Sequence, residues 1–480
     1  MGLKSKTVKG LGWSFADNAA NQGLRFLVGL VLARLVTPHD YGLIGIALIF
    51  VTVFESVVDG GFTNALIQKK LPTEKDYGTA FLTNTVVSLI IYAIIFLLAP
   101  KIAIFFNHEP QIVNIVRVVS CLLVIDALVL VPRARLTKAM DFKIQTKISL
   151  VSSVFAGVTG ISMAFCGMGV WALVGQQLAR HGCNSLLLSI ICRHNLTFSF
   201  SKESFRSLFS FGSKLLLSDL INSIYRQFYS IVIAKCFSPV TLGHYTRAHQ
   251  FSTFFSVTFT QIVQKVSFPA LSSIQDEDEK VREGYRMLIK YSMFIDLICM
   301  LGLAAVSRPM IVTLIGSQWL EAVPYLQILC FMMMFYPLQA INLNILKVKG
   351  RSDLFLRLEI INRVLGIFPL LTGIIFHNIH WMLIGSVIAE IIGYYLNSHY
   401  SGKLIGYSIS QQVKDIFPEF CIASLIAIIL YCMSFAEFTD YILFPLQIVA
   451  GIILVVLFSE ITRLDAYLGI KSIICSRYSK

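Results

Sequence analysis

The chain has 480 residues, of which 56% are hydrophobic and only 14% are charged, and its mean hydropathy is +0.73. Soluble proteins carry about 25% charged residues, so this composition excludes a string of soluble domains and indicates an integral membrane protein. The 40 basic and 27 acidic residues give a formal net charge of +13. Cytoplasmic loops of membrane proteins collect such a basic excess, so we expect no nucleic-acid partner.

Fourteen segments are candidates to cross the bilayer, which takes about 20 apolar residues. Polar residues interrupt the first, seventh and eighth of them. The candidates run roughly 12–36, 41–66, 77–99, 111–132, 147–166, 169–191, 211–236, 241–271, 288–306, 322–345, 355–376, 380–399, 416–435 and 441–461. This pattern predicts an all-α polytopic membrane protein with 14 transmembrane helices.

Lysine and arginine gather in alternate loops of this arrangement. If the amino terminus is inside, the outer loops hold only Lys101, Arg308 and, at a helix end, Lys235. The inner loops hold the remaining clusters, at 69–75, 133–147, 193–214, 280–290, 347–357, 403–414 and 463–480. Because positive charge marks the cytoplasmic side, we expect both termini in the cytoplasm, with residues 1–10 as mature sequence.

A weak internal repeat relates the first span to the seventh. A shift of 201 positions aligns Asn21 with Asn222, Arg25 with Arg226, and Pro38 with Pro239. Internal repeats are common in transporters, and parallel halves enclose a central site with alternating access. We therefore expect two pseudo-symmetric six-helix lobes around a central cavity. The expected lobes are residues 1–200 (spans 1–6) and 201–402 (spans 7–12), and residues 403–480 hold two extra helices, spans 13 and 14, and a cytoplasmic tail.

Several motifs carry a resemblance to a known family. They are Leu35–Gly42 (LVTPHDYG), Val58–Gln68 (VDGGFTNALIQ), Leu242–Ala248, Phe268–Ser272, Gln318–Pro324 and Gly350–Arg357. Together they resemble the Wzx-type, colanic-acid and teichuronic-acid exporter branch of the multidrug/oligosaccharidyl-lipid/polysaccharide superfamily. The resemblance implies two six-helix lobes within fourteen spans. It also implies a flippase for undecaprenyl-pyrophosphate-linked oligosaccharide, such as an O-antigen, capsule or exopolysaccharide repeat unit, in the bacterial inner membrane.

Charged residues inside the spans are the candidate substrate site, because a charge in the bilayer faces a cavity or a partner. Asp17, Asn21 and Arg25 share one helical face, as do Asp219, Asn222 and Arg226. Arginine binds phosphate by forked hydrogen bonds, so the two stripes are expected to hold a pyrophosphate. The alternative is that both arginines pair with carboxylates and join the lobes. The candidate substrate-binding residues are Arg25, Arg226, Asn21, Asn222 and, near a cavity mouth, Arg247.

Two acidic residues in the second span, Glu55 and Asp59, are candidates for coupling to a proton or sodium gradient. An exchanger needs a carboxylate that changes its charge or binds the ion. An equally good alternative is that Asp59, before Gly60 and Gly61, pairs at a helix end or between lobes. No other cofactor and no metal site is expected, since the ten cysteines and nine histidines form no ligand motif.

Two other functions remain open at this point. A cation-coupled antiporter of small molecules or drugs would share the superfamily but would favour an acidic cavity. A membrane-embedded glycan polymerase or ligase would need a large outer loop, which the chain lacks, and it has no nucleotide-binding P-loop. We therefore expect a transporter and not an enzyme. Its expected partners are a lipid-linked oligosaccharide, membrane lipids and the polysaccharide polymerase machinery.

Overall fold

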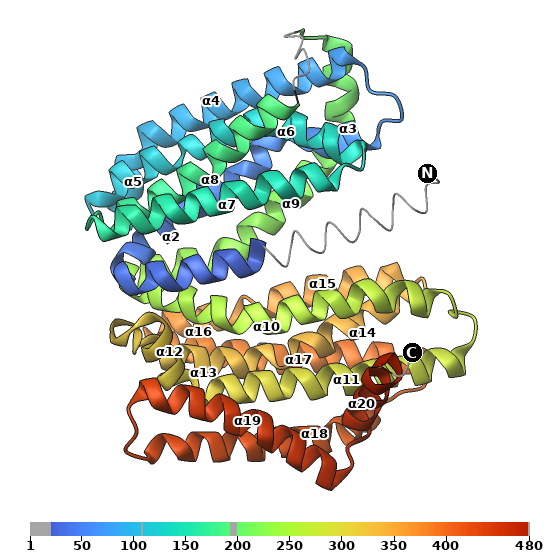
Figure 1. Cartoon of the computed structure of the whole chain (residues 1–480). Coiled ribbons are helices and arrows are strands. Elements are labelled where there is room, and N and C mark those ends of the chain that lie inside the picture. Colours follow the sequence, from blue (N-terminus) through green and yellow to red (C-terminus); the bar gives the residue numbers. More distant parts are fainter. Residues whose placement is uncertain (1–20, 107–108, 193–198, 479–480) are drawn as a thin grey trace. The chain divides into compact units, whose positions relative to one another are not determined.

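A computed structural model describes residues 21–106, 109–192 and 199–478 of the chain, with side-chain environments up to residue 472. All regular elements in these ranges are helices (Figure 1). By internal contacts the chain divides into two units, Met1–Gly243 and His244–Lys480. This division does not test the sequence repeat, so the lobes 1–200 and 201–402 and the extra segment 403–480 stay a prediction. Asp17 lies outside the described residues.

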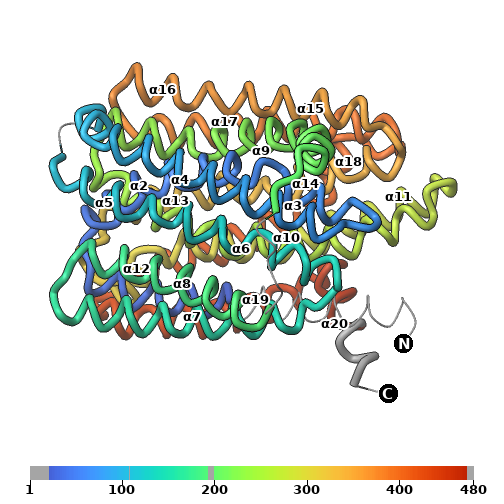
Figure 2. The backbone as a smooth tube through the Cα atoms, turned by 90° about the horizontal axis from the view of Figure 1, so that it is seen from above, coloured from blue at the N-terminus to red at the C-terminus, as the bar shows by residue number. Residues whose placement is uncertain are grey.

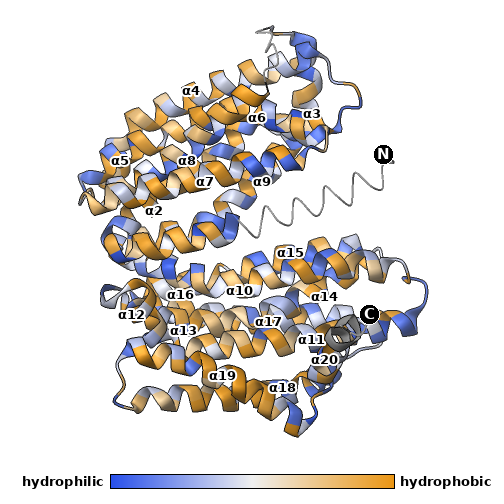
Figure 3. Cartoon of the chain, in the orientation of Figure 1, coloured by the Kyte–Doolittle hydropathy of each residue, from blue (hydrophilic) through white to orange (hydrophobic). Residues whose placement is uncertain are grey.

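The first unit consists of one helix over residues 21–35 and eight further helices. Their bounds are α2 (Pro38–Asp59), α3 (Phe62–Gln68), α4 (Glu74–Phe105), α5 (Gln111–Val119), α6 (Cys121–Lys138), α7 (Phe142–Phe165), α8 (Val170–Ile191) and α9 (Lys202–Cys236). Helix α7 packs along α8 and α4 along α6, while α9 packs against α2, α3 and α4. Helix α4 is apolar along most of its length, whereas the residues around α3 are hydrophilic (Figure 3).

The second unit is built mainly from α10 onward. Its helices are α10 (Pro239–Ser272), α11 (Asp278–Ala305), α12 (Ser307–Ile315), α13 (Ala322–Met333), α14 (Tyr336–Val348), α15 (Ser352–Leu365), α16 (Phe368–Phe376), α17 (Ile379–Ile405), α18 (Ile409–Cys432), α19 (Asp440–Thr462) and α20 (Asp465–Tyr478). Helices α15 and α16 follow one another along α17 (Figure 2), and α11 packs along α18.

Ten helical stretches among the described residues are long and apolar enough to span a membrane. The protein is therefore an all-helical, multi-pass membrane protein. The sixth, seventh and eighth predicted spans are also helical where they are described, but they do not reach this level of hydropathy. The described part of the first predicted span, residues 21–35, is helical but shorter than a membrane span. The count of fourteen transmembrane helices therefore stays a prediction.

The second predicted span, 41–66, is two helices and not one. Helix α2 ends at Asp59, and Gly60 and Gly61 follow with φ angles of 55° and 72°. This left-handed region favours glycine, which has no Cβ to clash there. The chain turns at these two glycines and continues as α3, so that Asp59 lies at a helix end, as the alternative interpretation expected.

The two repeated motifs start helices in the same way. The Thr37 hydroxyl accepts a hydrogen bond from the backbone N–H of Asp40 at 3.2 Å, and Pro38 is the first residue of α2. At the equivalent place the Ser238 hydroxyl accepts from the N–H of Thr241 at 3.0 Å, before α10. A hydroxyl cap followed by proline is a favoured helix start, so the repeat extends to local structure.

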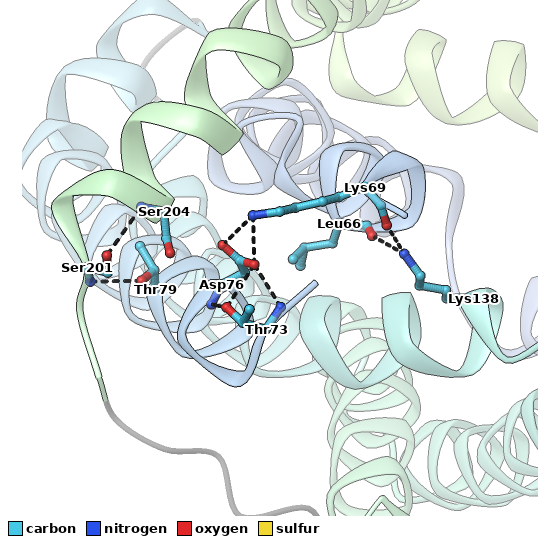
Figure 4. Close-up of polar contacts among 8 residues, drawn as sticks. All are labelled: Leu66, Lys69, Thr73, Asp76, Thr79, Lys138, Ser201 and Ser204. Carbon is cyan, nitrogen blue, oxygen red and sulfur yellow. Dashed lines mark hydrogen bonds and ion pairs between the residues drawn. The ribbon is translucent and has the colours of Figure 1, made fainter. Parts of the chain in front are cut away.

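A buried aspartate organises the lysine-rich end of the first unit (Figure 4). The Asp76 carboxylate is almost fully buried and lies 2.8 Å from the Lys69 ammonium. It also accepts hydrogen bonds from the backbone and hydroxyl of Thr73, which begins α4. The Lys138 ammonium donates to the carbonyl of Leu66 at 3.1 Å. These contacts tie α3, α4 and α6 together.

A similar arrangement holds the second unit where α17 meets α18. The Arg286 guanidinium donates to both Asp415 carboxylate oxygens, and the Nη2–Oδ1 distance is 2.6 Å. Tyr407, in the turn between these helices, donates its phenol proton to Asp415 at 2.7 Å. Burial, together with this hydrogen bond to the carboxylate, raises the pKa of Tyr407, so the phenol keeps the proton that it donates.

Candidate functional site

Charged side chains from five helices of the first unit are linked in pairs by electrostatic interactions or through hydrogen-bonded serines, and we call them the charged network. Its members come from the helix over residues 21–35 and from α2, α6, α8 and α9. They are Arg25, Glu55, Asp59, Asp126, Arg133, Arg180, His181, Asp219 and Arg226. Apolar helices do not carry such residues without a polar partner or an aqueous cavity.

A histidine–carboxylate pair joins α8 to α6 within this network. The Nδ1 atom of His181 lies 2.7 Å from Oδ1 of Asp126, and both side chains are largely buried. Glu55 of α2 interacts electrostatically with both members of the pair and with Arg133. Charged groups of α2, α6 and α8 therefore interact within the first unit.

Two arginines of the network repel each other. Arg25, on the first helix, lies close enough to Arg180 of α8 for their positive charges to interact unfavourably. The negative charge of Asp126 attracts the Arg180 guanidinium and offsets part of this repulsion. Two guanidiniums held near one another create a positive potential that favours an anion with more than one charge.

Helix α9 presents its polar face to α2. The hydroxyls of Ser223 and Ser56 are 2.9 Å apart, and the Arg226 Nη2 atom donates to Ser223 Oγ at 3.4 Å. One turn along, Asp219 and Asp59 interact as like charges. The structure thus brings the predicted stripe of α9 together with the predicted acidic residues of α2.

Asp59 is held by the helix that follows it. Its Oδ1 atom accepts hydrogen bonds from the backbone N–H of Thr63, at 3.2 Å, and from the Thr63 hydroxyl. Glu55, one turn earlier in α2, has an exposed side chain. Of the two predicted coupling residues, Glu55 is the one that interacts with the histidine–carboxylate pair, whereas Asp59 is bonded to Thr63.

The two predicted asparagines have different surroundings. Asn21 is buried, with 5% of its surface exposed, and its side-chain oxygen accepts a hydrogen bond from Ser153 of α7 at 2.8 Å. Asn222 of α9 is half-buried. Their part in substrate binding stays a prediction.

Arg247 belongs to the second unit. It is 8% exposed, and its Nη1 atom donates to the side-chain oxygen of Gln250 at 2.6 Å. Its guanidinium also lies 5.9 Å from the ring centre of Trp319. The chain thus holds Arg247 by polar and aromatic contacts within its own unit, and its role toward substrate stays a prediction.

From the sequence, Arg180 is one of several further basic residues inside the spans, Asp126 is one of several scattered acidic ones, and His181 has no assigned role. The available signal was a pair of adjacent basic residues, Arg180 and His181, inside an apolar stretch. Which acidic residue they meet depends on how α6 packs against α8, which the sequence does not reveal. Among the described residues, no group of three or more histidine, cysteine or carboxylate ligands could hold a metal ion.

The helical architecture matches that of solved transporters. It is similar to "Lipid II flippase MurJ, inward closed conformation", with a TM-score of 0.72 and 16% identity over 95% of this chain and 99% of that one. It is also similar to an inward-facing multidrug resistance MATE family transporter of the MOP superfamily, with a TM-score of 0.62, 16% identity, and coverage of 80% and 94%. The chain therefore has the MOP superfamily fold.

A family model described as "Polysaccharide biosynthesis protein" matches residues 31–324, and the chain belongs to this family. It is 24% identical to the lipopolysaccharide biosynthesis protein WzxC of Escherichia coli K12, covering 90% of this chain and 89% of that protein. It is 27% identical to the teichuronic acid biosynthesis protein TuaB of Bacillus subtilis 168, over 80% of each. The succinoglycan biosynthesis transport protein ExoT of Rhizobium meliloti 1021 is 24% identical, over 68% of this chain and 66% of that protein.

These relationships confirm the resemblance to the Wzx-type exporters. The protein is a membrane polysaccharide-biosynthesis transporter, and its family consists of transporters and not of enzymes.

Proposed function

We propose that the protein flips an oligosaccharide linked to undecaprenyl pyrophosphate across the inner membrane of a bacterium by alternating access. The glycan would be a repeat unit of O-antigen, capsule or exopolysaccharide, and the termini would lie in the cytoplasm. The names of the relatives support a glycan substrate, since three of them take part in lipopolysaccharide, teichuronic acid and succinoglycan biosynthesis. Membrane lipids and the polymerase machinery would be its partners.

The approach of Arg25 to Arg180 is the observation that carries this proposal. Two like charges in neighbouring helices create a positive potential that attracts an anion, and Asp126 offsets part of the charge of Arg180. Pyrophosphate offers two phosphates on one short head group, and each can accept forked hydrogen bonds from a guanidinium. Arg226 adds a third cation in the same unit, where Ser223 orients it.

The acidic half of the network would couple transport to a gradient. Protonation of Glu55, Asp126 or His181 changes the charge that faces the arginines, so a proton would alter how strongly the network holds an anion. Sodium would act on the same carboxylates. A drug antiporter would use these acidic residues for a cationic substrate, which the neighbouring guanidiniums disfavour.

The proposal is tested by flipping assays in vesicles with a fluorescent undecaprenyl-pyrophosphate oligosaccharide. The Arg25→Gln, Arg180→Gln and Arg226→Gln variants are expected to flip slowly at matched amounts of folded protein. Arg117→Gln is the matched control, because Arg117 lies 4.3 Å from the ring centre of Phe96 and donates to a carbonyl of α4. It removes an arginine of the same unit outside the network.

Normal flipping by all three network variants would reject the substrate role and leave the arginines as structural pairs. Flipping as slow in Arg117→Gln as in the others would mean that loss of any arginine within these helices disturbs the unit. Wild-type protein that exports a cationic drug and leaves the lipid pyrophosphate in place would favour the antiporter.

A further inference from the structure

A second polar site lies at the opposite end of the first unit from Lys69 and Asp76. It is a pocket of about 370 Å³, lined by residues at the start of α2, at the start of α5 and in the turn from α7 to α8. Figure 1 shows where α2, α5, α7 and α8 lie in the first unit. Pockets that hold small ligands span about 300–1,000 Å³. We call it the Trp171 pocket, and its polar lining consists of Asp40, Gln111, Asn114 and the indole of Trp171.

Two glycines shape the turn that carries the indole. Gly167 has a φ angle of 72°, and Gly169 has φ 52° and ψ −125°, a conformation that is accessible almost only to glycine. The backbone N–H of Trp171 then donates to the carbonyl of Met168 at 3.1 Å as α8 begins. This geometry leaves the indole partly exposed, at 37% of its surface, beside the polar side chains.

The polar groups come from two other helices. The Asp40 carboxylate is fixed by the Thr37 hydroxyl, which donates to Oδ2 at 2.7 Å, and it lies about 3.6 Å from the place where a Cβ on Gly169 would be. Gln111 and Asn114 are three residues apart on α5, so their exposed amides share one face. An amide both donates and accepts hydrogen bonds, whereas a carboxylate only accepts.

This combination suits a sugar. The C–H face of a pyranose packs on an aromatic ring, and its hydroxyls donate to a carboxylate and exchange hydrogen bonds with amides. The lining contains no lysine or arginine and includes one carboxylate. This lining disfavours a phosphate and differs in charge from the network around Arg25 and Arg180.

We infer that the Trp171 pocket is a saccharide subsite that binds a neutral hexose of the transported glycan. This inference rests on the proposed function and adds where the sugar, as opposed to the pyrophosphate, is held. Asp40 lies in the first turn of α2, a helix of 22 residues that is about 33 Å long. Lys69 follows α3, which begins after the glycine turn at the far end of α2. The lysine-rich end is the predicted cytoplasmic side, so the subsite would face the compartment into which the glycan is delivered.

The test uses protein in lipid nanodiscs and saturation-transfer NMR with free disaccharides of glucose, galactose and N-acetylglucosamine. Wild type should give signals for at least one of them, and Trp171→Leu and Asn114→Ala should weaken binding roughly tenfold or more, as expected for the loss of an aromatic anchor or a polar contact. Trp381→Leu is the matched control, because Trp381 is also exposed but lies in the second unit beside Phe376.

A second variant keeps the turn and blocks the pocket. A Cβ at Gly167 would meet no atom within 4 Å, and asparagine tolerates the left-handed φ angle of this position. Gly167→Asn should therefore fold, as judged by size-exclusion chromatography, and should also lose the sugar signals. Equal signals in wild type and Trp171→Leu, signals from no disaccharide, or displacement of the sugar by inorganic pyrophosphate would each overturn the inference.

The flipping assay separates this inference from the proposed function. If wild type does not flip the lipid pyrophosphate, the proposed function fails whatever the NMR shows. If wild type flips it and Trp171→Leu still binds sugar normally, only the saccharide subsite fails.

Discussion

The His181 Nδ1 atom lies 2.7 Å from Asp126 Oδ1 and joins α8 to α6 within the first unit. Histidine and carboxylate side chains that lie together inside a membrane are typical of proton relays in pumps and transporters. Because Glu55 of α2 interacts with both groups, a proton bound by the pair would change the electrostatic interaction between the pair and α2.

We expect Asp126→Asn and His181→Gln to abolish transport driven by a proton gradient while substrate binding remains measurable. Each change removes a titratable group but preserves the size of the side chain and its capacity for a hydrogen bond. The measurement is uptake into vesicles with and without an imposed pH gradient. His39→Gln, which changes a histidine paired with Glu109 outside the network, should behave as wild type. Gradient dependence that survives in both network variants would assign coupling to other residues.

Arginine-to-lysine changes distinguish binding by charge from binding by a planar fork. Lys at position 25, 180 or 226 retains the charge but cannot make two parallel hydrogen bonds to one phosphate. We expect each change to weaken binding of lipid pyrophosphate by about 1.5–3 kcal/mol, the worth of one charged hydrogen bond. Binding measured by fluorescence anisotropy in detergent would check this. Unchanged affinity in all three would mean that the network supplies charge alone.

Gly212 allows α9 to approach the turn between α2 and α3. A Cβ added there would lie 2.7 Å from the carbonyl oxygen of Gly60, closer than a Cβ normally comes to a non-bonded heavy atom. We expect Gly212→Ala to lower the thermal midpoint of the purified protein, because one backbone must move. Gly302→Ala is the control: a Cβ there meets nothing within 4 Å, and alanine favours the helix by roughly 1 kcal/mol. Equal midpoints for the two variants would contradict this contact.

The predicted topology can be checked independently of transport. Reporter fusions after Lys70, Lys143, Lys202 and Lys349 should report the cytoplasm. Fusions at His39, Gly167 and Asn378 should report the opposite side, which is where the Trp171 pocket would open. Two adjacent loops on the same side would remove a span from the predicted fourteen.

Asp76 is expected to be more important for folding than its position at a helix end suggests. Asp76→Ala removes the partner of Lys69 and the acceptor of the Thr73 hydrogen bonds, at a cost of about 1–3 kcal/mol. The yield of monodisperse protein in detergent should fall. Asp353→Ala, which breaks an exposed pair with Arg351 at the start of α15, should leave the yield unchanged. Similar yields for both variants would show that the buried pair of Asp76 and Lys69 adds nothing to the stability of the fold.

Hydropathy and charge predicted most of the helices. A helix that crosses the bilayer needs about 20 consecutive apolar residues, and such a run can be recognised directly in the sequence. The break at Gly60 and Gly61 could have been inferred from the glycine pair, yet the apolar residues on both sides hid it. The candidate site could be predicted only in part from the sequence. Arg25, Arg226 and Glu55 stood out as charges in apolar surroundings, but the pairing of Asp126 with His181 depends on helix packing over 55 residues of sequence.

The polar faces of α8, α9 and α10 have a consequence for biogenesis. Each of these helices is too polar, among the described residues, to count as a membrane span by its own hydropathy. A charged residue in the middle of a lone helix costs about 2.5–3.5 kcal/mol on insertion. These helices therefore depend on their neighbours to enter the bilayer: α8 needs α6 and α7, and α9 needs α2 and α4, against which they pack. The first unit must insert as a cooperative group during synthesis, with its charged helices shielded by apolar ones before they meet lipid.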